Sequence, residues 1–191
     1  MAKNIAIFAS GNGSNAENIY RFFQKSSDIS VVLICSNNKG AYVVKRAEKL
    51  QIPLFLFTKQ GFENFFELKK VLEAKEIDFI ILAGFLLKIP KKILEHYPDK
   101  IINIHPALLP KYGGKGMYGN IVHKAVLENK EVESGITIHF VNSEYDDGEI
   151  IFQAKCKVKK DDSVESLVKK VQKLERDFFP KIIEGVIKNT Y

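Results

Sequence analysis

The chain has 191 residues, of which 46% are hydrophobic and 27% charged, and its formal net charge is +6. This length and composition are typical of one globular domain that buries a real hydrophobic core. The apolar run that precedes Gly11 is too short for a transmembrane helix and lacks a cleavage-type signal region, so we expect a cytoplasmic protein without a membrane partner. The lysines are scattered over helix-like segments, which favours solvated helix faces over a nucleic-acid partner.

Short apolar runs alternate with helical patterns through the first hundred residues. Strands are expected at residues 4–10, 29–36, 52–57 and 78–85, with helices at 15–25 and 41–51 and a charged amphipathic stretch before the last strand. Apolar runs as continuous as residues 31–35 and 79–82 are typical of a parallel sheet covered by helices on both faces. We therefore expect a doubly wound, Rossmann-like α/β sheet, which binds ligands beyond the carboxyl ends of its strands.

Residues 11–16, GNGSNA, lie between the first expected strand and the first expected helix. They match the loose G-x-G-x-x-A dinucleotide fingerprint, which also asks for an acidic residue near the end of the second strand. Asn37 and Asn38 stand there instead, which disfavours a nicotinamide-dependent oxidoreductase. Gly11 and Gly13 allow close approach of the backbone, and the helix N-terminus offers N–H groups to an anion, for which a terminal phosphate is our expectation. A tight turn that needs glycine only for its dihedrals is the alternative.

Asn103 and His105 interrupt an apolar run, and Pro106 and Pro110 prevent a strand or helix from continuing beyond it. Residues two apart on extended chain project to the same side, so the amide and the imidazole can address one reacting centre. An imidazole can give or take a proton near neutral pH, and an amide can donate to an oxygen that gains negative charge. We expect both at the carboxyl edge of the sheet, near residues 11–16, which we call the glycine loop. A hydrogen-bonded structural histidine is the alternative for His105 alone.

The second half of the chain has a different pattern. Residues 134–141 and 149–158 predict an antiparallel hairpin, and the loop between them contains Glu144, Asp146 and Asp147. If one of these carboxylates folds against His105, it favours the imidazolium, raises the pKa of the histidine and makes it a general acid; a solvated turn is the alternative. Residues 163–188 have helical spacing, and we expect Pro180 to break or kink that helix.

The sequence disfavours covalent and metal-dependent chemistry. It contains no G-x-S-x-G elbow, and Cys35 and Cys156 are interpreted as reduced core cysteines, so we expect no serine or cysteine nucleophile. The four histidines show no ligand spacing such as H-E-x-x-H, and we expect no metal. The pair of Asn103 and His105 fits acyl transfer without a covalent intermediate.

Three segments, SGNGSN, NIHPALLPKYGGKGMYG and SGITIHFVNSEYDDGEIIFQAKCKV, occur in this order over nearly the whole chain. Together they resemble the folate-dependent formyltransferases, and among these the enzymes that formylate glycinamide ribonucleotide. The resemblance implies a mostly parallel Rossmann-like sheet with helices on both faces and a C-terminal antiparallel hairpin. It implies one domain over residues 1–191, with a phosphate-binding half at 1–100 and a catalytic and folate-binding half at 101–191.

The implied reaction transfers a formyl group from 10-formyltetrahydrofolate to the amine of glycinamide ribonucleotide in de novo purine biosynthesis, without a metal. In this resemblance His105 is the catalytic acid, Asn103 stabilises the developing oxyanion and contacts folate, and Asp146 tunes the histidine. The other implied contacts are Gly13, Ser14, Asn15 and Glu175 for glycinamide ribonucleotide, and Leu86, Leu87, Lys88 and Ile89 for folate.

The sequence departs from the family pattern at two of these places. Asp147 stands where relatives often have glycine, so it stays open as an alternative to Asp146. Leu87 replaces a frequent arginine, so we expect mainly backbone contacts to folate there. His123 is interpreted as structural, and His139 as a residue that supports the site.

Other readings stay open at this point. Methionyl-tRNA formyltransferase and formyltetrahydrofolate deformylase use the same chemistry with an additional domain, for which we expect this chain to leave no room. A non-catalytic nucleotide- or folate-binding module is an alternative from a different class. The oligomeric state is left open.

Overall fold

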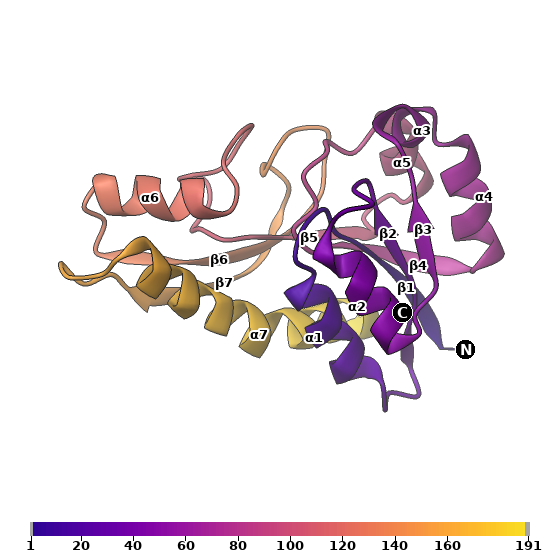
Figure 1. Cartoon of the computed structure of the whole chain (residues 1–191), viewed down its shortest axis with the longest axis horizontal. Helices are drawn as coiled ribbons and strands as arrows, with labels where there is room; N and C mark the ends of the chain where they lie inside the picture. The colour runs from indigo at the N-terminus through magenta and orange to yellow at the C-terminus, as the bar shows by residue number, and fades with distance from the viewer. Residues whose placement is uncertain (1, 190–191) are drawn as a thin grey trace.

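The apolar runs of the sequence form one mixed sheet in the computed structural model, which describes residues 2–189 (Figure 1). Within these residues the strands lie in the order β3-β2-β1-β4-β5-β6-β7. Their bounds are β1 (Lys3–Phe8), β2 (Ile29–Ser36), β3 (Leu54–Leu56), β4 (Ile77–Leu82), β5 (Ile101–His105), β6 (Glu133–Phe140) and β7 (Ile150–Lys157). The first five strands pair in parallel, whereas β6 pairs antiparallel with both β5 and β7. The predicted Rossmann-like sheet with a C-terminal antiparallel hairpin is confirmed.

Helices cover both faces of this sheet because the central strands are apolar on both sides. On β1, Ile5 and Ile7 belong to one buried cluster, and Ala6 and Phe8 belong to the other. The first cluster includes residues of α1 (Ser14–Phe23), α2 (Tyr42–Leu50), α6 (Asn120–Glu128) and α7 (Val164–Asn189). The second includes residues of α3 (Lys59–Asn64), α4 (Phe66–Ala74) and α5 (Lys91–His96).

The register between β5 and β6 places polar side chains of the two strands opposite each other. Asn103 pairs with His139, and His105 pairs with Thr137. β5 is thus the last parallel strand and also the first partner of the antiparallel hairpin, so residues from both halves of the chain meet on it.

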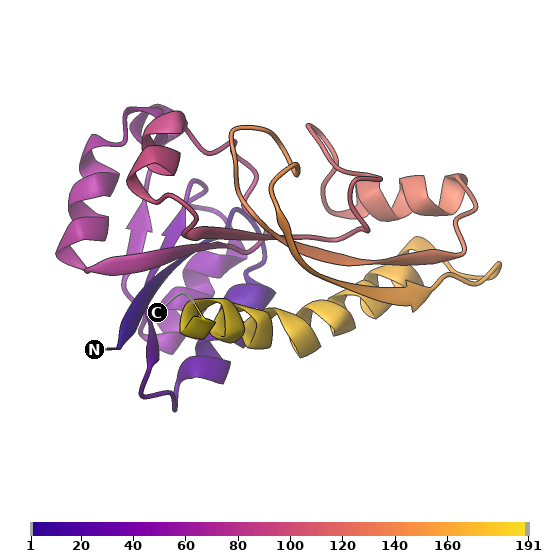
Figure 2. The same ribbon diagram turned by 180° about the vertical axis from the view of Figure 1, so that it is seen from behind.

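The helix α7 lies along β7, β6 and β5 and reaches α1 (Figure 2). We expected Pro180 to break or kink this segment. The helix does not break there, because α7 continues through Pro180 to Asn189. A proline cannot donate to the carbonyl four residues earlier. That carbonyl, on Arg176, instead accepts a hydrogen bond of 3.1 Å from the Asn18 side-chain amide of α1, while Phe179 and Pro180 are buried. No helix among residues 2–189 has the length and apolar character that crossing a membrane would require.

Candidate active site

A cavity of about 630 Å³ opens at the carboxyl edge of the parallel strands. Its walls come from the loops that follow β1 and β4, the end of β5, the loop before α6, the loop between β6 and β7, and one face of α7. This is the place where a doubly wound sheet binds its ligands. The structure therefore brings segments from the whole length of the chain to one site.

The glycine loop forms one wall of the cavity. Gly13 is the N-terminal cap of α1 and has a left-handed backbone, with φ of 74°. A Cβ atom on this glycine would lie only 2.5 Å from Val43 Cγ2, so both the backbone angle and the available space require glycine. The neighbouring Ser14 and Asn15 line the cavity at the first turn of α1, where backbone N–H groups lack helical partners.

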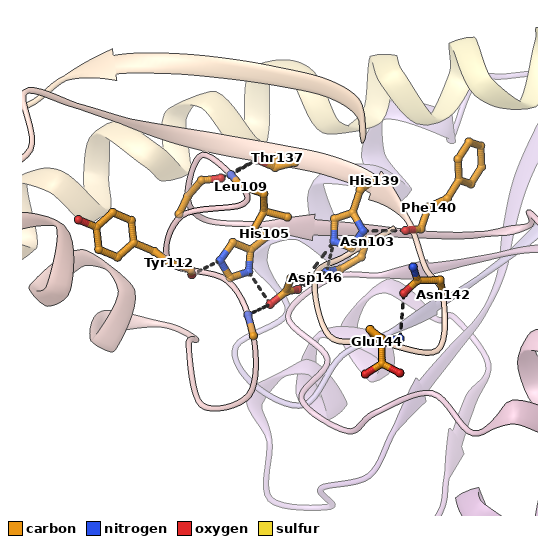
Figure 3. A network of polar contacts seen from close by, with 12 residues as sticks. Asn103, His105, Leu109, Tyr112, Thr137, His139, Phe140, Asn142, Glu144 and Asp146 are labelled. Atoms are coloured by element: carbon orange, nitrogen blue, oxygen red, sulfur yellow. Dashed lines mark hydrogen bonds and ion pairs between the residues drawn. The ribbon is translucent and has the colours of Figure 1, made fainter. Parts of the chain in front are cut away.

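His105 lies at the end of β5 and is 4% exposed. Its Nε2 is 2.7 Å from the Tyr112 backbone oxygen, and its Nδ1 is 3.5 Å from Asp146 Oδ2 (Figure 3). Because a carbonyl oxygen can only accept a hydrogen bond, Nε2 carries a proton, and protonation of Nδ1 would place a second N–H against the carboxylate. One proton of the imidazolium therefore has a carbonyl acceptor, and the other faces the carboxylate at ion-pair distance.

Burial and the carboxylate act on this histidine in opposite directions. Burial lowers the pKa of His105 below its ordinary value of 6.5, while the negative charge of Asp146 raises it, as the sequence predicted. Burial is the larger effect, so the pKa lies below the ordinary value rather than above it. The prediction of a raised pKa is therefore wrong for this structure, although the predicted contribution of the carboxylate is present.

Asn103 is held by His139 and Asp146. Nδ1 of His139 is 2.7 Å from the Phe140 carbonyl and must donate to it, so Nε2 of the neutral ring accepts the Asn103 amide at 3.0 Å. The second amide hydrogen points to Asp146 Oδ1 at 3.5 Å, a weak contact (Figure 3). The amide therefore has one firm bond inside the protein and one weak bond at the cavity wall.

The loop between β6 and β7 presents Asp146, and not Asp147, to His105. Asp146 has a left-handed backbone with φ of 54°, and its Oδ2 also accepts the Gly114 N–H at 2.9 Å. Burial raises the pKa of Asp146, but hydrogen bonding and the charge of a protonated His105 together lower it by more, so the net shift is downward and the carboxylate is ionised. Asp147 is exposed and does not line the cavity.

Glu175 reaches the cavity from α7 and is half-buried. Its Oε2 accepts a hydrogen bond of 2.9 Å from the Asn15 side chain, which joins the two segments that were predicted to hold one substrate. Burial raises the pKa of Glu175 more than this hydrogen bond and Arg176 lower it.

The segment 86–89 is only partly at the cavity. Leu86 lines it, and the Leu86 N–H donates to Ser10 Oγ at 3.0 Å, which links this segment to the glycine loop. Leu87 and Ile89 pack on the second core cluster, and Lys88 is exposed, 3.5 Å from Glu144. Side-chain contact with a cavity ligand is thus available at Leu86.

Comparison with known proteins shows which family the chain belongs to. The model of the formyl transferase family matches residues 3–183. The chain belongs to this family. Among its relatives is the phosphoribosylglycinamide formyltransferase of Bacillus subtilis, which is 35% identical over 190 residues that cover 97% of this chain and 95% of that protein.

Other formyl transferases are similar in sequence or in structure. The chloroplastic phosphoribosylglycinamide formyltransferase of Arabidopsis thaliana is 40% identical over 96% of this chain, and the chain spans 65% of the length of that relative. The crystal structure of phosphoribosylglycinamide formyltransferase from Bacillus halodurans has a TM-score of 0.88 and 31% identity, covering 99% of this chain and 97% of the other.

Several residues that line the cavity of this formyl transferase were not predicted from the sequence. His123 was interpreted as structural, yet it is 4% exposed, lines the cavity, and its Nδ1 has no hydrogen-bond partner among the described residues. Gln172 and Val168 line the cavity three and seven residues before Glu175, so the helical period could have found them. Among residues 2–189, no group of three potential ligands is placed to hold a metal ion.

Proposed function

We propose that this formyl transferase transfers the formyl group of 10-formyltetrahydrofolate to the amine of glycinamide ribonucleotide, a step of purine biosynthesis. The observation that carries the proposal is that one cavity contains both a helix N-terminus, whose free N–H groups can bind an anion, and the cluster of His105, Asp146 and Asn103. The relatives of similar length, such as the Bacillus subtilis protein, are named for the same activity.

The nucleotide substrate takes the side of the cavity formed by the glycine loop and α7. The N–H groups at Gly13, Ser14 and Asn15 receive the phosphate. Glu175 accepts hydrogen bonds from the glycinamide end, and its bond to Asn15 keeps the carboxylate at a set distance from the phosphate loop. Leu86 and the loop around Asp146 provide the wall for the folate co-substrate.

Formyl transfer forms a bond between the amine nitrogen and the formyl carbon, and breaks the bond between that carbon and N10 of the folate. The amine loses a proton, and N10 gains one. His105, once protonated, acts as the general acid, and Asp146 stabilises the imidazolium during the transfer. The Asn103 amide hydrogen that makes the weak contact with Asp146 turns towards the oxygen of the tetrahedral intermediate. Its hydrogen bond stabilises the negative charge on that oxygen.

The test follows tetrahydrofolate release from 10-formyltetrahydrofolate in the presence of different formyl acceptors. We expect release that depends on glycinamide ribonucleotide, with equal amounts of formylglycinamide ribonucleotide formed. Release with water alone would indicate a deformylase, and release that requires methionyl-tRNA would indicate the tRNA enzyme. Binding of both ligands without any release would indicate a non-catalytic module, and each of these three results would reject the proposal.

A further inference from the structure

Arg46 of α2 forms hydrogen bonds with the glycine loop from outside the cavity. Its Nε donates to the Asn12 backbone oxygen at 2.9 Å, and its second terminal nitrogen donates to Asn12 Oδ1 at 2.9 Å. The remaining terminal nitrogen binds the Glu17 carboxylate in the first turn of α1, and the guanidinium lies over the Tyr42 ring, 4.9 Å from its centroid. One planar cation therefore fixes the backbone, one side chain of the loop and the helix that follows.

The helix α2 also forms a hydrogen bond with Gly11, the loop residue before Asn12. The Val43 N–H donates to the Gly11 oxygen at 3.1 Å, so two successive loop carbonyls accept hydrogen bonds from α2. In a trans peptide the N–H of the next residue points opposite to the carbonyl. Fixing the carbonyls of Gly11 and Asn12 on α2 therefore turns the N–H groups of Asn12 and Gly13 away from α2, and both residues line the cavity.

Glu17 poses an electrostatic problem for a phosphate at this place. A carboxylate in the first turn of α1 would repel an anion at the same helix end. Hydrogen bonds from Arg21 and Arg46 lower the pKa of Glu17, so the group is ionised and its charge is offset by two guanidinium groups. Arg46 is the one of these two that also holds the loop.

We propose that Arg46 is a positioning residue that sets the glycine loop for a phosphomonoester, and thereby selects the phosphorylated substrate over its nucleoside. The inference deepens the proposed function and rests on it for the identity of the substrate. Arg46 does not line the cavity, so its effect is transmitted through Asn12 and Glu17. A lysine there keeps the charge but cannot form the three-way planar contact.

The first test compares Arg46→Lys with Arg21→Lys, a matched control that alters the other guanidinium bound to Glu17 without touching the loop. For Arg46→Lys we expect kcat/KM to fall about tenfold or more with glycinamide ribonucleotide, the scale of lost charge-assisted hydrogen bonds. The KM for the folate and kcat/KM for the dephosphorylated nucleoside should stay within about twofold, as should all constants of Arg21→Lys. An equal loss with nucleotide and nucleoside would overturn the proposal, because it would show a general structural defect.

The second test separates this inference from the proposed function. Inorganic phosphate is titrated into ¹⁵N-labelled protein, and the amide shift of Gly13 is followed by NMR. We expect a saturable shift in the wild-type chain and weaker phosphate binding in Arg46→Lys. If the wild-type chain shows this shift, Arg46→Lys weakens it, and the wild type does not formylate the nucleotide, the proposed function fails, and the role of Arg46 in phosphate binding survives without an assigned substrate. Equal phosphate affinity of wild type and Arg46→Lys would overturn the inference whatever the activity.

Discussion

At the scale of single residues, two opposing effects determine the pKa of His105. A buried imidazole favours its neutral form, whereas Asp146 and the Tyr112 carbonyl favour the imidazolium. A general acid whose pKa is kept below its ordinary value releases its proton readily to a leaving nitrogen. The carboxylate offsets part of the effect of burial and so increases the fraction of His105 that is protonated.

Replacing His105 by alanine should strongly reduce formyl transfer. We expect kcat to fall about a hundredfold to ten-thousandfold, the usual contribution of a positioned acid or base. Steady-state kinetics with both substrates measures this loss, and circular dichroism of the variant checks that the fold is kept. Turnover near the wild-type rate would reject the assigned role.

Changing Asp146→Asn should move the titration of His105 in a known direction. The carboxylate raises the pKa of this histidine against burial, so its removal should lower the pKa further. NMR titration of the imidazole measures the shift. Asp147→Asn is the matched control, because Asp147 is exposed and outside the cavity, and it should leave the titration unchanged. A shift in the control and none in Asp146→Asn would reverse the assignment.

At the scale of elements, the segment after β5 is held by one buried hydroxyl. Thr137 Oγ1 on β6 donates to the Ala107 oxygen at 2.7 Å and accepts from the Leu109 N–H at 3.0 Å. The Gln153 side-chain amide on β7 donates both to Thr137 Oγ1 and to the Leu109 carbonyl. The hairpin therefore holds the chain where it leaves His105, in addition to presenting Asp146.

Thr137→Val should destabilise the protein by about 1–3 kcal/mol, because an isosteric methyl group leaves the buried partners of the hydroxyl unsatisfied. Denaturant unfolding measures the free energy. Thr137→Ser keeps the hydroxyl and is the control, for which we expect a smaller loss. If valine and serine were equally destabilising, packing of the methyl group rather than the hydrogen bonds would explain the role of Thr137.

How far the sequence predicts this site depends on the range of the contacts. The spacing of Asn103 and His105 on one strand predicts their shared direction, since strand geometry is local. The choice between Asp146 and Asp147 depends on a left-handed residue in a loop that folds back over β5, which no local pattern encodes. In the helix through Pro180, the carbonyl that the proline leaves without a helical donor is likewise satisfied by Asn18, a residue far away in the sequence.

At the scale of the whole molecule, the site holds the half-buried carboxyl of Glu175 at a cost to stability. Burial raises the pKa of Glu175 above its ordinary 4.5, so the folded chain holds that proton to higher pH than the unfolded chain does. The contribution of this group to stability is therefore present below pH 4.5 and is lost as the pH rises through the folded-state pKa. Above that pH the ionised carboxylate opposes folding.

Glu175→Gln should therefore melt at a higher temperature than the wild type at pH 8, and the difference should shrink as the pH falls towards 4.5. The glutamine oxygen can still accept from Asn15, so the hydrogen bond of the wild type is retained. Calorimetry across this pH range measures the effect, and the variant should also bind glycinamide ribonucleotide less tightly. A difference in melting temperature that does not change with pH would contradict the explanation.

The pairing of β5 with β6 determines where the chain tolerates a change of length. Side chains in a strand alternate between the two faces, so inserting one residue between 103 and 105, or between 137 and 139, would change the register of the pair and turn His105 or His139 away from its partners. The turns at 129–132 and 159–162 lie outside this register and outside the cavity. Within them, Glu131 bonds Lys111 and Tyr112, and Asp162 bonds Ser166 and Lys170. For a protein engineer, the exposed pair Lys160 and Asp161 is therefore the place to attach a tag or a fused domain.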